Sequence, residues 1–170
     1  ATAARVFFDE QGFLEVETPQ RVPSPGLDLH LDAFEAAGAF LITSPEYQMK
    51  RLLAGGFPRI YQLVRCFRAD ERGDLHNSEF LMLEWYRAGC DYEALMDDCE
   101  ALLRAALDAS GGARLSFRGL ECDPRLPAER LSVADAFSRY AGLDVFALVP
   151  GPGDTYEDQF FRVLLNQVEP

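Results

Sequence analysis

Apolar residues recur along the first part of the chain at spacings typical of a helix and then of a strand. They share one helical stripe in the segment 3–11, and Gly12 offers the left-handed backbone that often ends a helix. Apolar and polar residues alternate in the segment 14–18, and Pro19 has no N–H to donate to a neighbouring strand. The pattern therefore predicts a helix followed by a half-buried strand.

A loop, two short strands and a helix are predicted next. Prolines and a glycine mark the loop at 20–28, a rough strand pattern resumes at 29–34, and 40–43 is a short apolar strand. The residues Ser, Pro and Glu at 44–46 supply an N-cap, a proline at the first helical position and an acid in the first turn. We expect a helix from this proline to the next pair of glycines.

The middle of the chain predicts a hairpin and a long helix. Residues 60–67 have the composition of a strand, 68–78 form a polar loop, and 79–87 are rich enough in aromatic and apolar residues to form a second, buried strand. This arrangement is an antiparallel hairpin with a long connection. Apolar residues then recur at helical spacing over 91–109, with an aspartate as the cap and the glycine pair 111–112 as the stop. We expect this helix to cover the sheet.

The last third of the chain is less regular. Residues 114–130 follow neither periodicity, 132–140 and 156–168 have helical spacing, and Pro-Gly-Pro-Gly at 150–153 interrupts the chain between them. Helices and antiparallel strands that follow no regular βαβ alternation indicate an α+β fold. With 170 residues and 48% hydrophobic content, one globular domain or a large part of one is expected.

The overall charge limits the classes of binding partner. A net charge of -12 gives no general attraction to nucleic acid or to an anionic membrane. Any bound polyanion must be held by a local cluster of positive groups, and one is present at Arg65, Arg68, Arg72 and Arg87. No apolar run is long enough to span a bilayer, and the first residues do not resemble a signal peptide. A soluble, cytoplasmic protein is therefore expected.

The cysteines do not have the spacing of a metal site. The four of them, Cys66, Cys90, Cys99 and Cys122, include no CxxC pair, and the chain has only two histidines. A zinc site or a disulfide framework would need closer spacing. We therefore expect buried, reduced thiols and no metal ligands in this sequence.

The segment 67–80 carries the pattern that discriminates best between functions. A strand that ends in Arg68, a charged loop and a returning strand that opens with Phe80 can together form a nucleotide clamp. A guanidinium group suits bidentate binding of phosphate, and an aromatic face can stack on a base. The alternative is a solvated charged loop with Phe80 in the core, since charged loops are common.

This segment resembles motif 2 of the class II aminoacyl-tRNA synthetases in its lysyl form, which has Arg-x-[Glu/Asp], a flexible loop, then His-Asn-x-Glu-Phe. The segment 12–19 resembles motif 1, in which a helix and a strand ending in proline build the dimer interface. The segment 43–53 resembles the substrate-side segment between the two motifs. The three matches stand in the right order over about residues 1–110. They imply a class II synthetase-like antiparallel sheet flanked by helices, present as a partial domain.

Within that group the chain most resembles the elongation factor P-lysine ligase family. The residues that point there are Ser-Pro-Glu-Tyr at 44–47 and Leu-Glu-Trp-Tyr-Arg at 83–87. Members of this family resemble the catalytic domain of a lysyl-tRNA synthetase without its anticodon-binding domain. The resemblance implies ATP-dependent activation of lysine or a lysine isomer as its adenylate and transfer to a lysine of elongation factor P. It also implies a homodimer formed through motif 1.

The resemblance assigns contacts to ATP. Arg68 would bind the α-phosphate and offset the charge that develops as the amino-acid carboxylate attacks, which makes it the catalytic candidate. Asp70 stands where the family often has glutamate, with Glu71 beside it, and either acid could meet the adenine amino group or the substrate. The remaining ATP contacts, to phosphate or ribose and to the stacked adenine, are His76, Asn77 and Phe80.

Three further residues, Ser44, Glu46 and Tyr86, would line the amino-acid pocket, where a carboxylate suits an ammonium group of the substrate. For Glu46 the alternative is an acid in the first turn of a helix, favoured by the helix dipole. For Tyr86 the alternative is a core residue with a satisfied hydroxyl. Trp85 should face away from Tyr86 on a strand, and we predict that it is a packing residue.

Two parts of a class II site have no counterpart in this sequence. Nothing after Gly111 resembles motif 3, whose arginine contacts the γ-phosphate, or the acidic residues that hold magnesium. We therefore place the Mg2+ ligands outside these residues and expect the isolated chain to be catalytically deficient. The predicted division is a catalytic core with motifs 1 and 2 at 1–110 and a partly irregular, partly helical continuation of the same domain at 111–170.

Other functions stay open. The first is a lysyl-tRNA synthetase that charges tRNA, although a net charge of -12 fits a protein acceptor slightly better. The second is a non-catalytic synthetase-like paralogue that binds an amino acid or a regulated partner, which Asp70 and the missing motif 3 favour and the ATP clamp opposes. A purely structural or dimerisation module would require all three motif matches to be accidental. Lysine and its isomers are not distinguished by the sequence.

Overall fold

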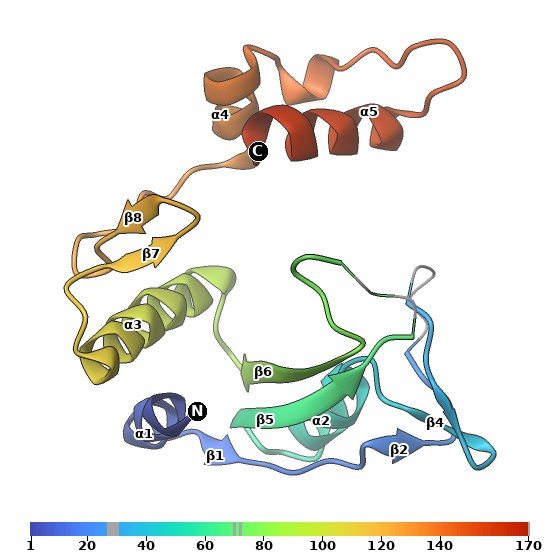
Figure 1. Cartoon of the computed structure of the whole chain (residues 1–170), viewed down its shortest axis with the longest axis vertical. Helices are drawn as coiled ribbons and strands as arrows, with labels where there is room; N and C mark the ends of the chain where they lie inside the picture. The colour runs from blue at the N-terminus through green and yellow to red at the C-terminus, as the bar shows by residue number, and fades with distance from the viewer. Residues whose placement is uncertain (27–30, 70, 72, 170) are drawn as a thin grey trace. The chain divides into compact units, whose positions relative to one another are not determined.

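Figure 1 shows the computed structural model of the chain, which describes residues 1–26, 31–69, 71 and 73–169. These residues form two compact units, Ala1–Leu126 and Pro127–Pro170. The division lies later than the one predicted after residue 110, since the short hairpin that follows the long helix belongs to the first unit. Whether the function also divides after residue 110 stays a prediction.

The first unit contains a three-stranded sheet with strands in the order β1-β5-β6. Its strands are β1 (Leu14–Glu15), β5 (Arg59–Phe67) and β6 (Glu79–Arg87). β1 runs parallel to β5, whereas β5 and β6 are antiparallel and pair along their whole length. The predicted hairpin is confirmed, and the antiparallel pairing with flanking helices confirms the α+β fold class.

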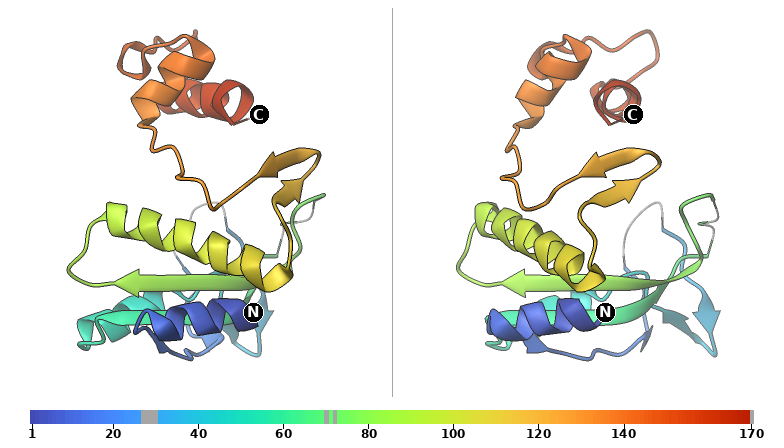
Figure 2. Two further views of the ribbon diagram at one scale, coloured as in Figure 1. Left: turned by 90° about the vertical axis from the view of Figure 1, so that its left-hand side faces the viewer. Right: turned by 60° about the vertical axis from the view of Figure 1, so that its left-hand side comes forward.

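One face of this sheet packs against helices α1 (Thr2–Glu10) and α3 (Tyr92–Ser110), which lie beside each other over the hairpin in Figure 2. The core here is aromatic. The fully buried Phe8 stacks on Tyr61 with ring centroids 4.6 Å apart, and its ring lies 5.5 Å from that of Trp85. The prediction that Trp85 is a packing residue is confirmed.

The opposite face packs against a second, smaller sheet and contacts helix α2 (Glu46–Ala54). The small sheet is antiparallel in the order β2-β4-β3, with β2 at Arg21–Val22, β4 at Ala39–Leu41 and β3 at Glu35–Ala36. The buried residues of this second core are Val22, Ile42, Val64 and Cys66, with Phe80 and Met82 packed against them. Each face of the hairpin thus has its own core.

The strands at the edges differ from the prediction. The strand expected over 14–18 is reduced to β1, because the Val16 N–H donates to the Tyr61 carbonyl (2.9 Å) and the chain then leaves β5. Both residues of β1 are exposed, so the half-buried strand was a wrong prediction. β6 was predicted to be buried, but most of its residues are half-buried because it is the last strand of its sheet.

The small sheet was only partly predicted. The predicted loop 20–28 contains β2, and the predicted strand 40–43 is β4 with shifted ends. Of the strand predicted over 29–34, residues 29 and 30 lie outside the described residues. Residues 31–34 are not a strand, and β3 follows directly after them.

Helices α2 and α3 occupy the segments predicted for them. The N-cap of α2 is Pro45 rather than Ser44, although the Ser44 hydroxyl still accepts from the Glu46 N–H (3.1 Å). The Asp91 carboxylate caps α3 as predicted, and Gly111 ends it with a φ of 68° in the left-handed region. The segment 114–130, expected to be irregular, contains the hairpin β7 (Leu115–Phe117) and β8 (Leu120–Cys122).

The second unit is a small helical cluster around Phe137, Val145 and Val163. Its elements are α4 (Val133–Ala136), a π-helix (Phe137–Ala141), a 3-10 helix (Val145–Ala147), α5 (Tyr156–Val163) and a second π-helix (Leu164–Val168). Both predicted helices are confirmed, and each continues into wider π turns. Within the part of the chain that the structure describes, no helix is long and apolar enough to cross a membrane.

All four cysteines are free, but only Cys66 is buried. The prediction of buried thiols is wrong for Cys90, Cys99 and Cys122, which are exposed. Cys90 follows the end of β6, Cys99 lies on α3 and Cys122 ends β8. No group of three or more His, Cys, Asp or Glu side chains among the described residues could hold a metal ion.

Candidate active site

The site residues carried by the hairpin lie on one face of the sheet. Alternate residues of a strand point to the same face, so Phe80, Glu84 and Tyr86 share the face of their cross-strand partners on β5. Arg68 follows β5 in the same alternation and extends this face beyond the strand end. The helical core of α1 and α3 occupies the other face, whereas on this face Phe80 packs against the core of the small sheet and Arg68, Glu84 and Tyr86 lie outside that cluster.

Hydrogen bonds to the backbone of two segments, 42–43 and Ser78, fix the position of Arg68. Its own N–H donates to the Ser78 carbonyl (2.9 Å), and the preceding Phe67 N–H donates to the Ile42 carbonyl (2.9 Å). The Arg68 Nε donates to the Thr43 carbonyl at 3.3 Å. The guanidinium is therefore anchored at the end of the hairpin before any ligand binds.

Arg68 and Phe80 are brought together as the clamp prediction requires. The Arg68 guanidinium carbon lies 5.1 Å from the centre of the Phe80 ring, within the range of a cation–π contact. The Arg68 side chain is 23% exposed, so it is partly shielded from water. A phosphate bound by this guanidinium and a base stacked near this ring would lie on the same side of the sheet.

Glu71 forms an ion pair with Arg68, with Nη1 and Oε1 3.3 Å apart. The ion pair is a further anchor of the Arg68 guanidinium. A phosphate that binds this guanidinium would have to compete with the Glu71 carboxylate. Asp70, the other candidate acid, lies outside the described residues. Which of the two acids contacts the nucleotide stays open.

His76 and Asn77 lie in the connection between β5 and β6, and both are exposed. The His76 N–H and carbonyl exchange hydrogen bonds with the backbone of Gly73 at 3.3 and 3.2 Å, which closes a turn. Among the described residues neither side chain forms a hydrogen bond, ion pair or ring contact with Arg68 or Phe80. Their contacts to ATP remain predictions.

Glu84 links the residues predicted for the amino-acid pocket, although sequence reasoning did not assign it a role. One of its carboxylate oxygens accepts from the Ser44 hydroxyl (3.0 Å) and the other from the Tyr86 hydroxyl (2.5 Å). The Ser44 oxygen in turn accepts from the Glu46 N–H. The sequence did contain a signal for this role: Glu84 is the one acid among the apolar and aromatic residues that share its face of β6.

The electrostatics of this pocket suit a cation. Burial, followed by the hydrogen bond to Glu84, raises the pKa of Tyr86, so its hydroxyl stays protonated and donates at neutral pH. Burial raises the pKa of the neighbouring Cys66 thiol to about 11, and the Glu84 charge adds to this. A carboxylate has about four acceptor sites, so the Glu84 and Glu46 side chains can each accept from a further donor such as an ammonium group.

Glu46 and Tyr86 also have the structural roles that the sequence left open for them. Glu46 does lie in the first turn of α2, where it forms an ion pair with Lys50. Tyr86 does have a satisfied hydroxyl, but its partner is a carboxylate of the pocket rather than a group in the core. Tyr86, through its hydroxyl, and Glu46, through its backbone N–H, therefore belong to one hydrogen-bonded cluster with Ser44 and Glu84.

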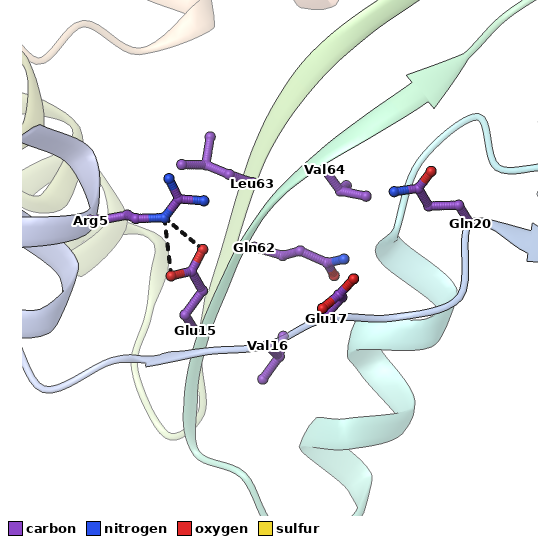
Figure 3. Close-up of a pocket in the computed structure, with 8 residues that line it drawn as sticks. All are labelled: Arg5, Glu15, Val16, Glu17, Gln20, Gln62, Leu63 and Val64. Atoms are coloured by element: carbon purple, nitrogen blue, oxygen red, sulfur yellow. Dashed lines mark hydrogen bonds and ion pairs between the residues drawn. The ribbon is translucent and has the colours of Figure 1, made fainter. Parts of the chain in front are cut away.

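A separate polar groove of about 440 Å³ lies along the free edge of β5, where the chain leaves the strand after β1 (Figure 3). Its lining residues are Arg5, Glu15, Val16, Glu17, Gln20, Gln62, Leu63 and Val64. The Arg5–Glu15 ion pair (2.9 Å) stands at one end, and the buried Gln62 amide accepts from the Thr18 hydroxyl (3.0 Å). Of the predicted ATP and amino-acid contacts that the structure describes, none lines this groove.

Comparison with known proteins agrees with this geometry. Residues 1–160 match the family model described as tRNA synthetases class II (D, K and N). The elongation factor P--(R)-beta-lysine ligase of Yersinia enterocolitica is 42% identical over 170 residues, which cover 91% of this chain and 50% of the relative. The ligase of the same name from Vibrio cholerae is 44% identical over 124 residues, covering 67% of this chain and 38% of the relative.

A third relative of that name, from Hamiltonella defensa, is 38% identical over 182 residues, covering 98% of this chain and 54% of the relative. The chain thus spans about half the length of the curated relatives it matches. The family model covers the helix and strand of motif 1, the β5–β6 hairpin with Arg68 and Phe80, and the Glu84 pocket. This chain belongs to the class II tRNA synthetase family of the D, K and N type.

Proposed function

We propose that this chain supplies the ATP clamp and the amino-acid pocket of a ligase that activates a lysine isomer and transfers it to elongation factor P. The observation that carries the proposal is the placement of an arginine–phenylalanine clamp and of the Glu84 carboxylate, bonded to Ser44 and Tyr86, on one face of the β5–β6 hairpin. The names of the relatives support (R)-β-lysine as the amino acid and elongation factor P as the acceptor.

In the activation step, a carboxylate oxygen of the amino acid bonds to the α-phosphorus of ATP. The bond from that phosphorus to its bridging oxygen breaks, and pyrophosphate leaves. Arg68 would stabilise the negative charge on the α-phosphate during this step, because its guanidinium is already anchored by Thr43 and the strand end. Phe80 would hold the adenine beside it.

In the transfer step, the amine of an acceptor lysine attacks the carbonyl carbon of the adenylate. An amide forms, AMP leaves, and the amine gives up a proton. Glu84 and Glu46 would hold the ammonium groups of the activated amino acid throughout, with Tyr86 and Ser44 keeping the Glu84 carboxylate in position.

Magnesium is expected with ATP in this family, but the described residues do not form a site for it. Its ligands, like motif 3, would come from elsewhere in the full-length gene product. The isolated chain of 170 residues is therefore expected to show no lysine-dependent exchange of pyrophosphate into ATP. Exchange by the isolated chain would contradict this expectation.

The dimer implied by motif 1 is part of the proposal. An open groove between α1 and α3 supports it, because apolar and small residues line most of it, including Ala3, Val6, Ala105 and Ala109. Val6 is 50% exposed, and a second copy would cover it. The mass of the full-length protein in solution tests this point, and a monomer at micromolar concentration would remove the dimer from the proposal.

The deciding experiment follows label from the amino acid to its acceptor. The full-length protein is incubated with ATP, magnesium and labelled (R)-β-lysine or lysine, in the presence of both elongation factor P and total tRNA. Label on elongation factor P is the expected result, with (R)-β-lysine used in preference to lysine. Label on tRNA would make the protein a tRNA synthetase. No label and no release of pyrophosphate would favour the non-catalytic paralogue.

A further inference from the structure

One cationic side chain on helix α2 pairs with an acid predicted to line the amino-acid pocket. Lys50 lies one turn after Glu46, and its ammonium forms an ion pair with the Glu46 carboxylate. The pKa of Lys50 is raised first by this hydrogen bond and charge, and further by the charges of Glu84 and Tyr47. Lys50 is thus within electrostatic reach of an acid on a different element, β6, as well as its neighbour along the helix.

The two carboxylates of the pocket are satisfied in different ways. Both oxygens of Glu84 accept from neutral hydroxyl groups, those of Ser44 and Tyr86, so its negative charge has no cation in direct contact among the described residues. The side chain of Glu46 has Lys50 as its one hydrogen-bonded partner in the described part of the chain. The ion pair is 40–56% exposed, so it can open at little cost.

We propose that Lys50 is a resident ammonium that occupies the Glu46 carboxylate until the ammonium group of the amino acid replaces it. This inference rests on the proposed function, since it concerns the same amino-acid pocket. Lys50 then sets the affinity of the pocket for cationic amino acids by competing with them for one carboxylate. An ordinary surface pair at spacing i,i+4 would stabilise the helix only and would leave substrate affinity unchanged.

The test compares Lys50→Met with Lys50→Arg in the full-length protein by pyrophosphate exchange dependent on (R)-β-lysine. Lys50→Met removes the competing charge, and the KM for the amino acid is expected to fall about three- to tenfold. The KM for ATP and kcat should stay within about twofold, because among the described residues Lys50 pairs with Glu46 and not with Arg68 or its partner Glu71. Lys50→Arg keeps the positive charge and should retain a KM near that of the wild type.

A matched control removes one positive charge elsewhere. Arg114→Met breaks an exposed ion pair with Glu121 on the β7–β8 hairpin and changes the net charge by the same amount. It should leave the KM for the amino acid unchanged. Thermal unfolding of each variant separates loss of helix stability from a change in affinity.

Three results would overturn the inference. An unchanged KM in Lys50→Met would make Lys50 a helix-stabilising residue only. A raised KM at unchanged kcat would show that Lys50 orients Glu46 instead of competing for it. If the wild type shows no exchange, the proposed function has failed, and calorimetric titration of both proteins with (R)-β-lysine decides: the inference requires tighter binding by Lys50→Met, and equal or absent binding rejects it.

Discussion

On one face of the β5–β6 hairpin Phe8 and Tyr61 stack in a fully buried aromatic core, whereas on the other Glu84 and Tyr86 share a hydrogen bond beside helix α2. Both faces come from the same two strands and differ by one residue in register. A sheet with a period of two can therefore separate packing from chemistry residue by residue. Substitutions on the two faces should affect different measured quantities.

The largest effect is expected on the packing face. Phe8→Ala removes a fully buried ring that contacts Tyr61 and Trp85, and should lower the free energy of unfolding by about 3–5 kcal/mol. Urea unfolding followed by circular dichroism measures the change. Val6→Ala on the same helix is the control, since its half-exposed side chain should contribute much less. A loss below about 1 kcal/mol in Phe8→Ala would contradict the aromatic core.

Arg68→Ala should act on the chemical face instead. We expect the full-length variant to lose about 100- to 1000-fold in kcat for pyrophosphate exchange, because the charge on the α-phosphate loses its preorganised partner. Its unfolding free energy should change little. Arg65→Ala is a matched control: the sequence grouped Arg65 with Arg68, but it lies on the other face of β5 in an exposed pair with Glu79, and its loss should leave exchange within about twofold. Equal losses in both variants would contradict the division between faces.

Glu84→Gln tests whether the chemical face has separate sites for the amino acid and for ATP. The amide keeps the shape of the side chain but removes the charge that would hold an ammonium group. The KM for the amino acid should rise about 10- to 100-fold, with the KM for ATP within about twofold, as measured by pyrophosphate exchange. A rise in the KM for ATP of similar size would place Glu84 in the nucleotide site.

The smallest expected effect is on how stability depends on pH, and it concerns Tyr61 on the packing face. Burial, with the charges of Glu15 and Asp9, raises the pKa of Tyr61 from 10.0 to about 12, and its hydroxyl donates to Glu15 (3.2 Å) and Asp9 (3.4 Å). The unfolded chain therefore loses this proton first as pH rises. The stability that depends on the protonated phenol is complete below pH 10 and is lost between about pH 10 and 12.

The free energy of unfolding of the wild type should therefore fall between about pH 10 and 12, and Tyr61→Phe should show a smaller fall, because it lacks this one titrating proton. Denaturant unfolding at several pH values in that range measures the slope. Tyr92→Phe is the control, since the Tyr92 side chain is 68% exposed and should leave the slope unchanged. Identical slopes for the wild type and Tyr61→Phe would contradict the raised pKa.

Local signals were enough to place much of the fold. The span of β6, the Asp91 cap and the Gly111 stop of α3 were all predicted, because each depends on residues within a few positions of one another. The β7–β8 hairpin was missed because its strands have three residues each, too few to show a period. The predicted ends of the strands at 14–18 and 29–34 were wrong, because the end of a strand depends on how far it pairs with its neighbouring strand.

The sequence by itself determined which residues share a face: alternation along β6 places Phe80, Glu84 and Tyr86 together, and the motif pattern marks Arg68. The tertiary structure decided which groups meet across the chain. Ser44 reaches Glu84 from 40 residues away, and Thr43 reaches Arg68 from 25. Such contacts depend on how strands pair over long separations, and no periodicity within a segment records that pairing.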